Sequence, residues 1–411
     1  MKTFFGNAVF VSLLFQILIC GTLLAETRES LEVKMREAEE TIWNRFYSPE
    51  TNLFYDYLTS YEKGKELAHL PQRPEVMRQY PNPCGYGTGM EDCMISAGVM
   101  MTAVLNRYRC DGYEEGSQRA EMIFRGIERS IQSVPGEGFV ARGYSPFAPD
   151  LFYINSSRDQ VTHAVGAMWE YYRSGLPSEE IQSRIGKCIK DVADRMQRNV
   201  TSENNYDFLC ADGTPCRYGI CKMENVLPHE AARLAMIYAV AWDITGEEGY
   251  FRLWREKIRP AAEGSLGPDP STATYGLLQM QESLAILSEL ESDFAIRKIL
   301  LDAARDASQL AASRISRLAS LENQIDLTCL APDWRETGGL VDPYRLVWYY
   351  PRERGEIMLT LLKDPNKQLF PELERFLFRS IEIVDFSQNS SCGVFDILAS
   401  WWMWKAAHLD K

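Results

Sequence analysis

The chain has 411 residues, of which 45% are hydrophobic, so it can bury a sizeable core in one or two domains. Acidic residues outnumber basic residues by 57 to 44, which gives a net charge of −13. Because neutralising phosphates requires a basic surface, this charge excludes nucleic acid as an expected partner.

The N-terminal segment is typical of an exported protein. After Lys2, an apolar run extends to Ala25 with small residues near its end, which predicts a secretory signal peptide over residues 1–25. We expect the mature protein to be a single domain over residues 26–411, secreted or periplasmic, with no membrane span once the signal is removed. An uncleaved anchor is the alternative, because the run is marginally long enough to cross a bilayer.

Nine of the ten cysteines follow this segment. Export places them in an oxidising compartment, where disulfides persist. Cys210, Cys216 and Cys221 crowd one loop, so we expect at least one disulfide within residues 201–227. No CxxC pair occurs and His229 is the only nearby histidine, so the sequence predicts neither a metal site nor another cofactor.

Apolar residues recur with the period of an α-helix through most of the chain, and the period-two pattern of strands is almost absent. Local signals mark several helix ends, such as Pro228 at a start and Gly246 just past an end. The sequence therefore predicts about twelve helices. They lie near residues 29–47, 91–109, 116–133, 157–174, 178–199, 228–245, 248–262, 272–289, 292–318, 346–362, 368–383 and 394–408.

The connections between these helices alternate in length. A short turn follows each even-numbered helix, whereas loops that are mostly long and rich in Gly, Pro and aromatic residues precede the even-numbered helices. This alternation predicts helical hairpins stacked side by side, with all the long loops on one face. Six hairpins that close on themselves form an all-α (α/α)6 barrel, and an open solenoid is the alternative. The loops before the even-numbered helices lie near residues 53–90, 134–155, 201–227, 264–271, 319–345 and 386–393.

In a closed barrel the even-numbered helices form the inner ring. Their small residues, such as Gly98, Gly166 and Ala235, suit tight packing there. Their N-termini converge on the long-loop face, where free backbone N–H groups and helix dipoles favour anions. We therefore expect the functional site at this face.

Asp159 opens one of these inner helices. Ser156 or Ser157 can cap its first turn, and a carboxylate there suits the helix dipole. His163 follows four residues later on the same helix face, with Gln160 between them. A carboxylate, an amide and an imidazole at the start of a buried helix are typical of a site, although a cap with an ion pair is the structural alternative.

Glycoside hydrolysis typically uses two carboxyl groups, one as acid and one as base or nucleophile. We predict Asp159 with Glu91 or Asp92 as this pair, because they come from adjacent inner helices. The competing explanation for Glu91 and Asp92 is stabilisation of a helix N-terminus. Arg142, which lies between two turn glycines, could hold a uronate carboxylate with its guanidinium fork. The expected substrate-binding residues are Arg142, Gln160, His163, Tyr144, His229, Trp334 and Arg335.

Three motifs occur in sequence: Gly-Phe-Val-x-Arg-Gly at residues 138–143, Ser-x-Asp-Gln-x-Thr at 157–162 and Trp-Glu-Tyr-Tyr-Arg-Ser at 169–174. Together they resemble secreted (α/α)6-barrel glycan-active enzymes, in particular unsaturated glucuronyl hydrolases and related exo-acting uronidases. The resemblance implies an acid/base role for Asp159. The second aspartate of that family lies in an Asp-Asn-x-x-Trp setting, whereas Glu91-Asp92 stands at the expected place without the Asn and Trp.

The sequence thus predicts a secreted glycoside hydrolase that acts on a uronic-acid-containing or otherwise decorated glycan. Two alternatives stay open. A polysaccharide lyase on the same barrel needs a base and an anion clamp, which His163 or His229 with Tyr144 or Tyr275 and Arg142 could supply. A non-enzymatic glycan-binding protein would leave the carboxylates of the long-loop face scattered.

Overall fold

The computed structural model describes residues 28–112, 114–342, 344–368 and 370–409. The expected signal peptide, residues 1–25, lies outside this part of the chain. Within it, helices dominate, and the two strands, β1 (Tyr47–Ser48) and β2 (Leu53–Phe54), form one short antiparallel pair. Among the described helices, none combines the length and the apolar character that a bilayer crossing demands.

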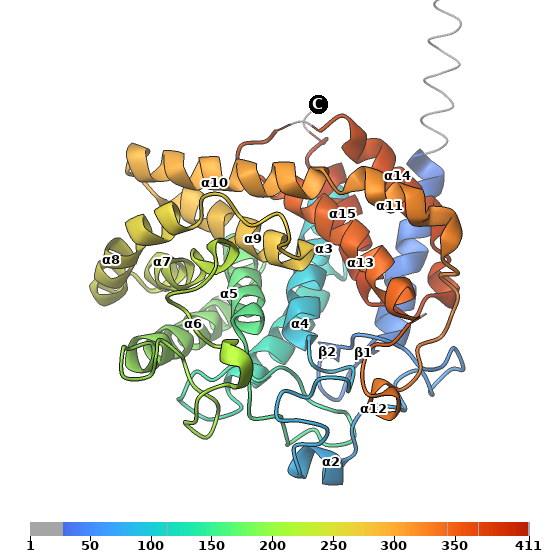
Figure 1. The fold of residues 1–411 in the computed structure, drawn as a ribbon, viewed down its shortest axis with the longest axis horizontal. Helices are drawn as coiled ribbons and strands as arrows, with labels where there is room; N and C mark the ends of the chain where they lie inside the picture. The colour runs from blue at the N-terminus through green and yellow to red at the C-terminus, as the bar shows by residue number, and fades with distance from the viewer. Residues whose placement is uncertain (1–27, 113, 343, 369, 410–411) are drawn as a thin grey trace, which may run out of the picture.

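Six of the described helices form a closed inner ring. Each contacts the next around the ring, and the last contacts the first, so the fold is an all-α (α/α)6 barrel (Figure 1). Closure rules out the open solenoid. The ring consists of α3 (Cys93–Asp111), α5 (Arg158–Arg173), α7 (Arg233–Thr245), α9 (Thr274–Leu290), α13 (Tyr344–Leu362) and α15 (Gly393–Ala406).

An outer ring of helices covers the inner one. The outer helices are amphipathic: α6, for example, buries Ile185, Ile189 and Met196 toward the inner ring. The inner helices are buried nearly all round, and α15 places Trp401 and Trp402 in the core. The outer ring consists of the helix over residues 28–45, α4 (Gly116–Ile131), α6 (Glu179–Asn199), α8 (Glu248–Gly264), α10 (Phe294–Ala312) and α14 (Glu372–Ile383).

One predicted helix is interrupted in the structure. The periodic segment near 292–318 divides into α10, which ends at Ala312, and α11 (Ile315–Leu321). Arg314 lies at the break, where its Nη1 atom donates a hydrogen bond to Thr274 Oγ1 at 2.6 Å. This tertiary contact with the start of α9 accompanies the break, which the local helical pattern does not predict.

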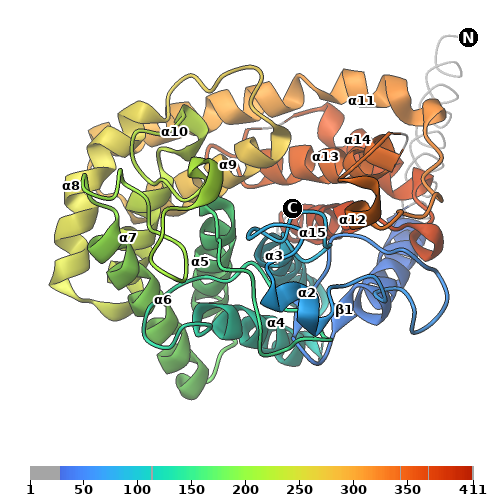
Figure 2. The same ribbon diagram turned by 60° about the horizontal axis from the view of Figure 1, so that its bottom comes forward.

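The loops that lead from outer to inner helices gather at one end of the barrel, here called the mouth. The short helices α2 (Arg73–Met77) and α12 (Trp334–Thr337) belong to two of these loops and lie at this end with β1 and β2 (Figures 1 and 2). Every inner helix therefore begins at the mouth, as the alternation of loop lengths predicts.

Two features fix the loops next to α5. Gly138 has a φ of +63°, and a Cβ there would lie 1.9 Å from the carbonyl oxygen of Asp191, so only glycine lets this loop pack on α6. In the following loop, a disulfide joins Cys216 to Cys221, which confirms the expectation of at least one bridge in this segment.

Candidate active site

Two carboxylates lie at the mouth, at the start of neighbouring inner helices. Asp92 precedes the first residue of α3, and Asp159 is the second residue of α5. The side chains of Asp92 and Asp159 are 22% and 31% exposed, although the groups that hold them are buried. Gln160 joins the two helices, because its Nε2 atom donates to Asp92 Oδ1 at 3.2 Å and to the Glu91 carbonyl at 3.0 Å.

Asp159 is held by a buried arginine of the next inner helix. Arg233 Nη1 donates to Asp159 Oδ1 at 2.5 Å, and its Nη2 donates to Gln279 Oε1 at 2.7 Å. Burial opposes ionisation of Asp159, but the charge and hydrogen bond of Arg233, with Arg158 and Arg142 nearby, hold its pKa below the ordinary value. Asp159 is therefore a carboxylate at neutral pH, a state that suits a nucleophile or a base.

Asp92 lies among both arginines and carboxyl groups. Arg352 Nη1 is 3.2 Å from its Oδ2 atom, and Arg142 Nη1 is 3.8 Å from its Oδ1 atom. Behind it, the buried Asp56 accepts a hydrogen bond from the Asp92 backbone N–H at 3.2 Å. Burial and the charges of Asp92 and Glu91 raise the pKa of Asp56 well above its ordinary value.

Glu91 shapes the loop that carries Asp92. Its carboxylate accepts backbone hydrogen bonds from Gly87 at 2.8 Å and Gly89 at 2.7 Å, and its side chain is buried. Burial and the neighbouring Asp92 raise its pKa to about 7. Of the two expected partners for Asp159, Asp92 thus has the more exposed carboxylate, and Glu91 has both oxygens engaged by its own loop.

Arg142 reaches the mouth from the loop before α5. Its Nη1 atom donates to the Glu91 carbonyl at 2.8 Å, and its Nη2 atom donates to the Tyr86 hydroxyl at 3.0 Å. The guanidinium also lies over the Tyr86 ring, 4.7 Å from its centroid. Both close hydrogen-bond partners are neutral, so the charge of this buried side chain is only partly balanced by Asp92.

A pocket of about 430 Å³ opens beside Asp92. Its walls include Tyr86, Trp348 and Tyr349, together with the expected residues Trp334 and Arg335. Tyr86 and Tyr349 are each 37% exposed, whereas Trp334 and Trp348 are buried. Exposed aromatic rings beside charged groups are suited to a sugar, whose apolar face stacks on a ring while its hydroxyls bind polar groups.

Trp334 and Arg335 are firmly held in that wall. The Trp334 ring stacks on Tyr57 with 4.1 Å between centroids. Arg335 Nη1 forms an ion pair with Glu75 at 2.8 Å, and its Nη2 atom forms a second with Asp333 at 2.7 Å. Their visible role is to fix the loop around α12 against the loop around α2.

The structure does not bring His163 and Tyr144 to the mouth. His163 is buried inside the ring, with Nδ1 3.3 Å from Glu282 Oε2, and burial with Lys363 lowers its pKa to about 3. Tyr144 is also buried, and its hydroxyl donates to the Arg129 carbonyl of α4 at 3.4 Å. Both side chains therefore contribute to packing between helices.

His229 lies near the mouth at the start of η2 (Pro228–Glu230). Its side chain is 15% exposed, and its Nε2 atom is 3.9 Å from Glu230 Oε1. Burial, opposed by Glu230 and reinforced by Arg233, lowers its pKa. His229 also interacts electrostatically with Asp159. The neutral imidazole of His229 therefore lies near the ionised carboxylate of Asp159.

Three charged residues that hold this site, Arg233, Asp56 and Arg352, are not among the site residues that the sequence predicts. Arg233 is the one basic residue of the largely apolar helix α7, and Asp56 interrupts a buried run between Tyr55 and Tyr57. A charged residue in an apolar segment is seldom buried without a partner, and this signal could have found both.

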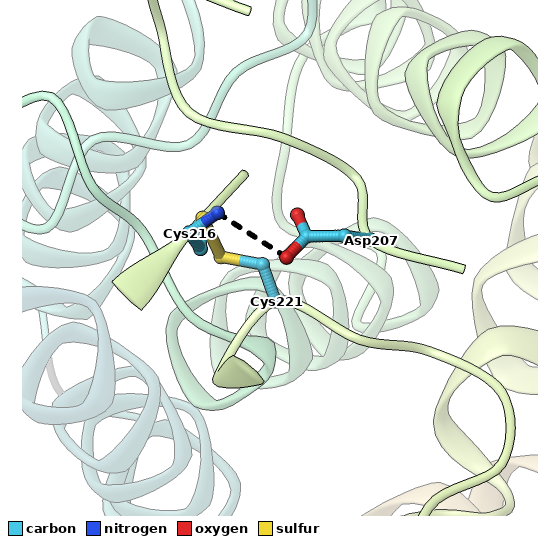
Figure 3. Close-up of side chains that lie close together, drawn as sticks. All are labelled: Asp207, Cys216 and Cys221. Atoms are coloured by element: carbon cyan, nitrogen blue, oxygen red, sulfur yellow. Dashed lines mark hydrogen bonds between the residues drawn. A yellow bond between two sulfur atoms is a disulfide. The ribbon is translucent and has the colours of Figure 1, made fainter. Parts of the chain in front are cut away.

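Asp207, Cys216 and Cys221 bring three potential metal-ligand atoms within 4.8 Å of one another. The two sulfurs are joined in the disulfide, and the Asp207 carboxylate accepts the backbone N–H of Cys216 at 3.2 Å (Figure 3). A thiolate is needed to bind a metal, so this group acts here as a structural turn.

Comparisons with known proteins bear on the fold. No protein-family model and no curated protein matches the chain. The structure is similar to the crystal structure of a sugar epimerase from a ruminal bacterium, with a TM-score of 0.50 and 11% sequence identity over 92% of this chain and 100% of that one. At this identity the likeness shows the helical-barrel fold alone.

Proposed function

We propose that this protein is a glycoside hydrolase in which Asp92 and Asp159 are the two catalytic carboxyl groups. The observation that carries the proposal is their position: partly exposed carboxylates at the start of neighbouring inner helices, inside an otherwise buried charged cluster at the mouth. Two carboxyl groups that flank a bound sugar are the usual requirement for cleaving a glycosidic bond.

The surroundings of the two carboxyl groups suggest different roles. Asp159 pairs closely with Arg233 and is ionised, so we assign it the base or nucleophile role. Asp92 lines the pocket in which we place the sugar. We assign Asp92 the role of the general acid that protonates the leaving oxygen.

The proposed substrate is an anionic, uronate-bearing oligosaccharide. Arg142 supports this, because its hydrogen-bond partners are neutral and Asp92, 3.8 Å away, balances its charge only in part, so a substrate carboxylate would complete the balance. Tyr86 and Tyr349 supply aromatic faces at the pocket beside Asp92. We place a terminal sugar in this pocket, which makes the enzyme exo-acting.

A second candidate is proton abstraction from a carbon next to a sugar carbonyl or carboxylate, the chemistry of an epimerase or a lyase. The specific observation in its favour is His229, a neutral imidazole beside the mouth that could act as a base. The solved structure with a similar fold is also described as a sugar epimerase.

Turnover of uronic-acid oligosaccharides distinguishes these candidates. The purified protein is incubated with a panel of saturated and unsaturated uronate-terminated substrates, while new reducing ends and the ultraviolet absorbance of a conjugated double bond are followed together. A hydrolase generates reducing ends and creates no double bond, and one that hydrates an unsaturated substrate also removes its double bond. If a double bond appears, or if the configuration of the sugar changes without cleavage, the hydrolase proposal is wrong and the reaction is proton abstraction.

A further inference from the structure

The loop over residues 200–232 contains a covalently closed turn next to the proposed site. The disulfide Cys216–Cys221 closes it, and the short helix η1 (Arg217–Gly219) lies inside it. Asp207 braces the turn, because its carboxylate accepts the Cys216 N–H at 3.2 Å (Figure 3). The other carboxylate oxygen of Asp207 accepts the Leu209 N–H, outside the turn, at 2.6 Å. The disulfide and the hydrogen bond from Cys216 to Asp207 thus restrain residues 216–221, which are here called the platform.

This platform holds Arg158, the first residue of α5. The Arg158 backbone N–H donates to the Ile220 carbonyl at 2.9 Å. Its Nη1 atom donates to the carbonyls of Gly219 and Lys222, both at 2.8 Å. Two of these three acceptors lie inside the closed turn and the third directly follows it, so the shape of the turn sets the position of Arg158.

Arg158 also connects the platform to the next inner helix. Its guanidinium pairs with the carboxylate of Glu230, which lies three residues before Arg233. Asp159 is thus fixed from two sides: Arg158 anchors its backbone to the platform, and Arg233 binds its carboxylate. Movement of the turn would shift the carboxylate relative to the mouth.

We propose that Arg158 and the disulfide-closed turn 216–221 position Asp159 for catalysis. Arg158 acts through Asp159 and is a positioning residue. The inference rests on the proposed catalytic role of Asp159, but the contacts that carry it are independent of the reaction.

The charges around Asp159 define what each variant should do. Arg233, Arg158 and Arg142 lower its pKa, and it interacts with His229 and with the hydroxyls of two tyrosines at the mouth, Tyr86 and Tyr275. Arg158→Gln removes one of the three positive charges, so the acid limb of the pH–activity profile should move to higher pH. Arg158→Lys keeps the charge but cannot reproduce the hydrogen bonds, so it should lower kcat and leave that limb in place.

The decisive variant is Cys216→Ser/Cys221→Ser. Both sulfurs are removed because the Cys210 sulfur lies 3.3 Å from that of Cys216 and could pair with it in a single variant. Cys329→Ser, at an exposed free cysteine, is the matched control. We expect kcat of the double variant to fall about 10- to 100-fold with a small change in KM, because misplacement of a catalytic group acts on the chemical step.

Hydrogen–deuterium exchange measures the positioning without any substrate. Amides at the start of α5 should exchange faster in the double variant than in the wild type or the Cys329→Ser control. Unchanged exchange, or faster exchange with a normal kcat, would overturn the inference. If the double variant does not fold, Arg158→Lys decides: normal kcat and exchange would overturn the inference in the same way. A wild type that hydrolyses no glycan would refute the proposed function, while the exchange result would still report on the anchor of α5.

Discussion

Asp159→Asn is the substitution whose consequences follow most fully from the structure. Asparagine keeps the size and one acceptor oxygen but cannot carry the charge of a base or nucleophile. Loss of the group should lower kcat by about 10²- to 10⁴-fold. The first turn of α5 should remain capped, because Ser157 accepts the Gln160 N–H and does not depend on Asp159.

The same substitution should also destabilise the fold. The side chain of Arg233 is 1% exposed, and Asp159 is its ionic partner. Removing one partner of a buried pair costs about 3–5 kcal/mol, and asparagine should stay near the lower limit because it still accepts a hydrogen bond. A loss of about 3 kcal/mol lowers Tm by about 4 °C in a chain of this length.

Activity and stability can be separated with a matched control. Glu39 is also buried and pairs with Arg107 at 2.7 Å and Arg119 at 3.0 Å, near the C-terminal end of α3 and away from the mouth. Glu39→Gln should lower Tm by a similar amount and leave kcat unchanged. Both variants are assayed well below their Tm, with the folded state verified by circular dichroism. Normal turnover by Asp159→Asn at a lowered Tm would refute the catalytic role and leave a structural ion pair.

Three further predictions follow from single contacts. Burial raises the pKa of Glu282 to about 7 from about 4.3 in an unfolded chain, so its ionisation weakens the fold as pH rises through this window. Glu282→Gln should therefore raise the free energy of unfolding at pH 8 by up to about 3 kcal/mol, and Tm with it, but should change both little at pH 4. Equal effects at the two pH values would contradict this. Gly138→Ala should cost about 2–4 kcal/mol in thermal unfolding because its Cβ would meet the Asp191 carbonyl, whereas Gly136→Ala, with a positive φ and open space, should cost about 1 kcal/mol. Arg142→Lys should raise KM for uronate substrates about 10- to 100-fold through loss of the guanidinium fork, and an equal rise for neutral sugars would argue against carboxylate recognition.

The architecture could be predicted from the sequence because it depends on local signals. Helical periodicity, end signals such as Gly246 and the alternation of loop lengths together determine hairpins, and six hairpins close into a ring. The break between α10 and α11 was not predicted, because it accompanies the contact of Arg314 with Thr274, a residue of another helix. Contacts between residues distant in the sequence have no local pattern.

The candidate site could likewise be predicted only where it depends on local signals in the sequence. Asp92 and Asp159 lie at helix starts, and the barrel brings helix starts together. Their partners, Arg352 and Arg233, come from other inner helices, so only closure of the ring reveals the pairs. Tyr144 was expected at the site because it follows the Arg142 motif in the sequence. Its side chain instead points toward α4, where its hydroxyl contacts the Arg129 carbonyl.

A crystal structure of the Asp159→Asn variant with a bound uronate-terminated oligosaccharide would test the central claim most directly. We expect the uronate carboxylate to contact Arg142, the terminal ring to lie in the pocket beside Asp92, and the glycosidic oxygen to face the Asp92 carboxyl group. A sugar bound away from Asp92 and residue 159, or one whose reacting carbon faces His229 with neither carboxyl group in contact, would contradict it.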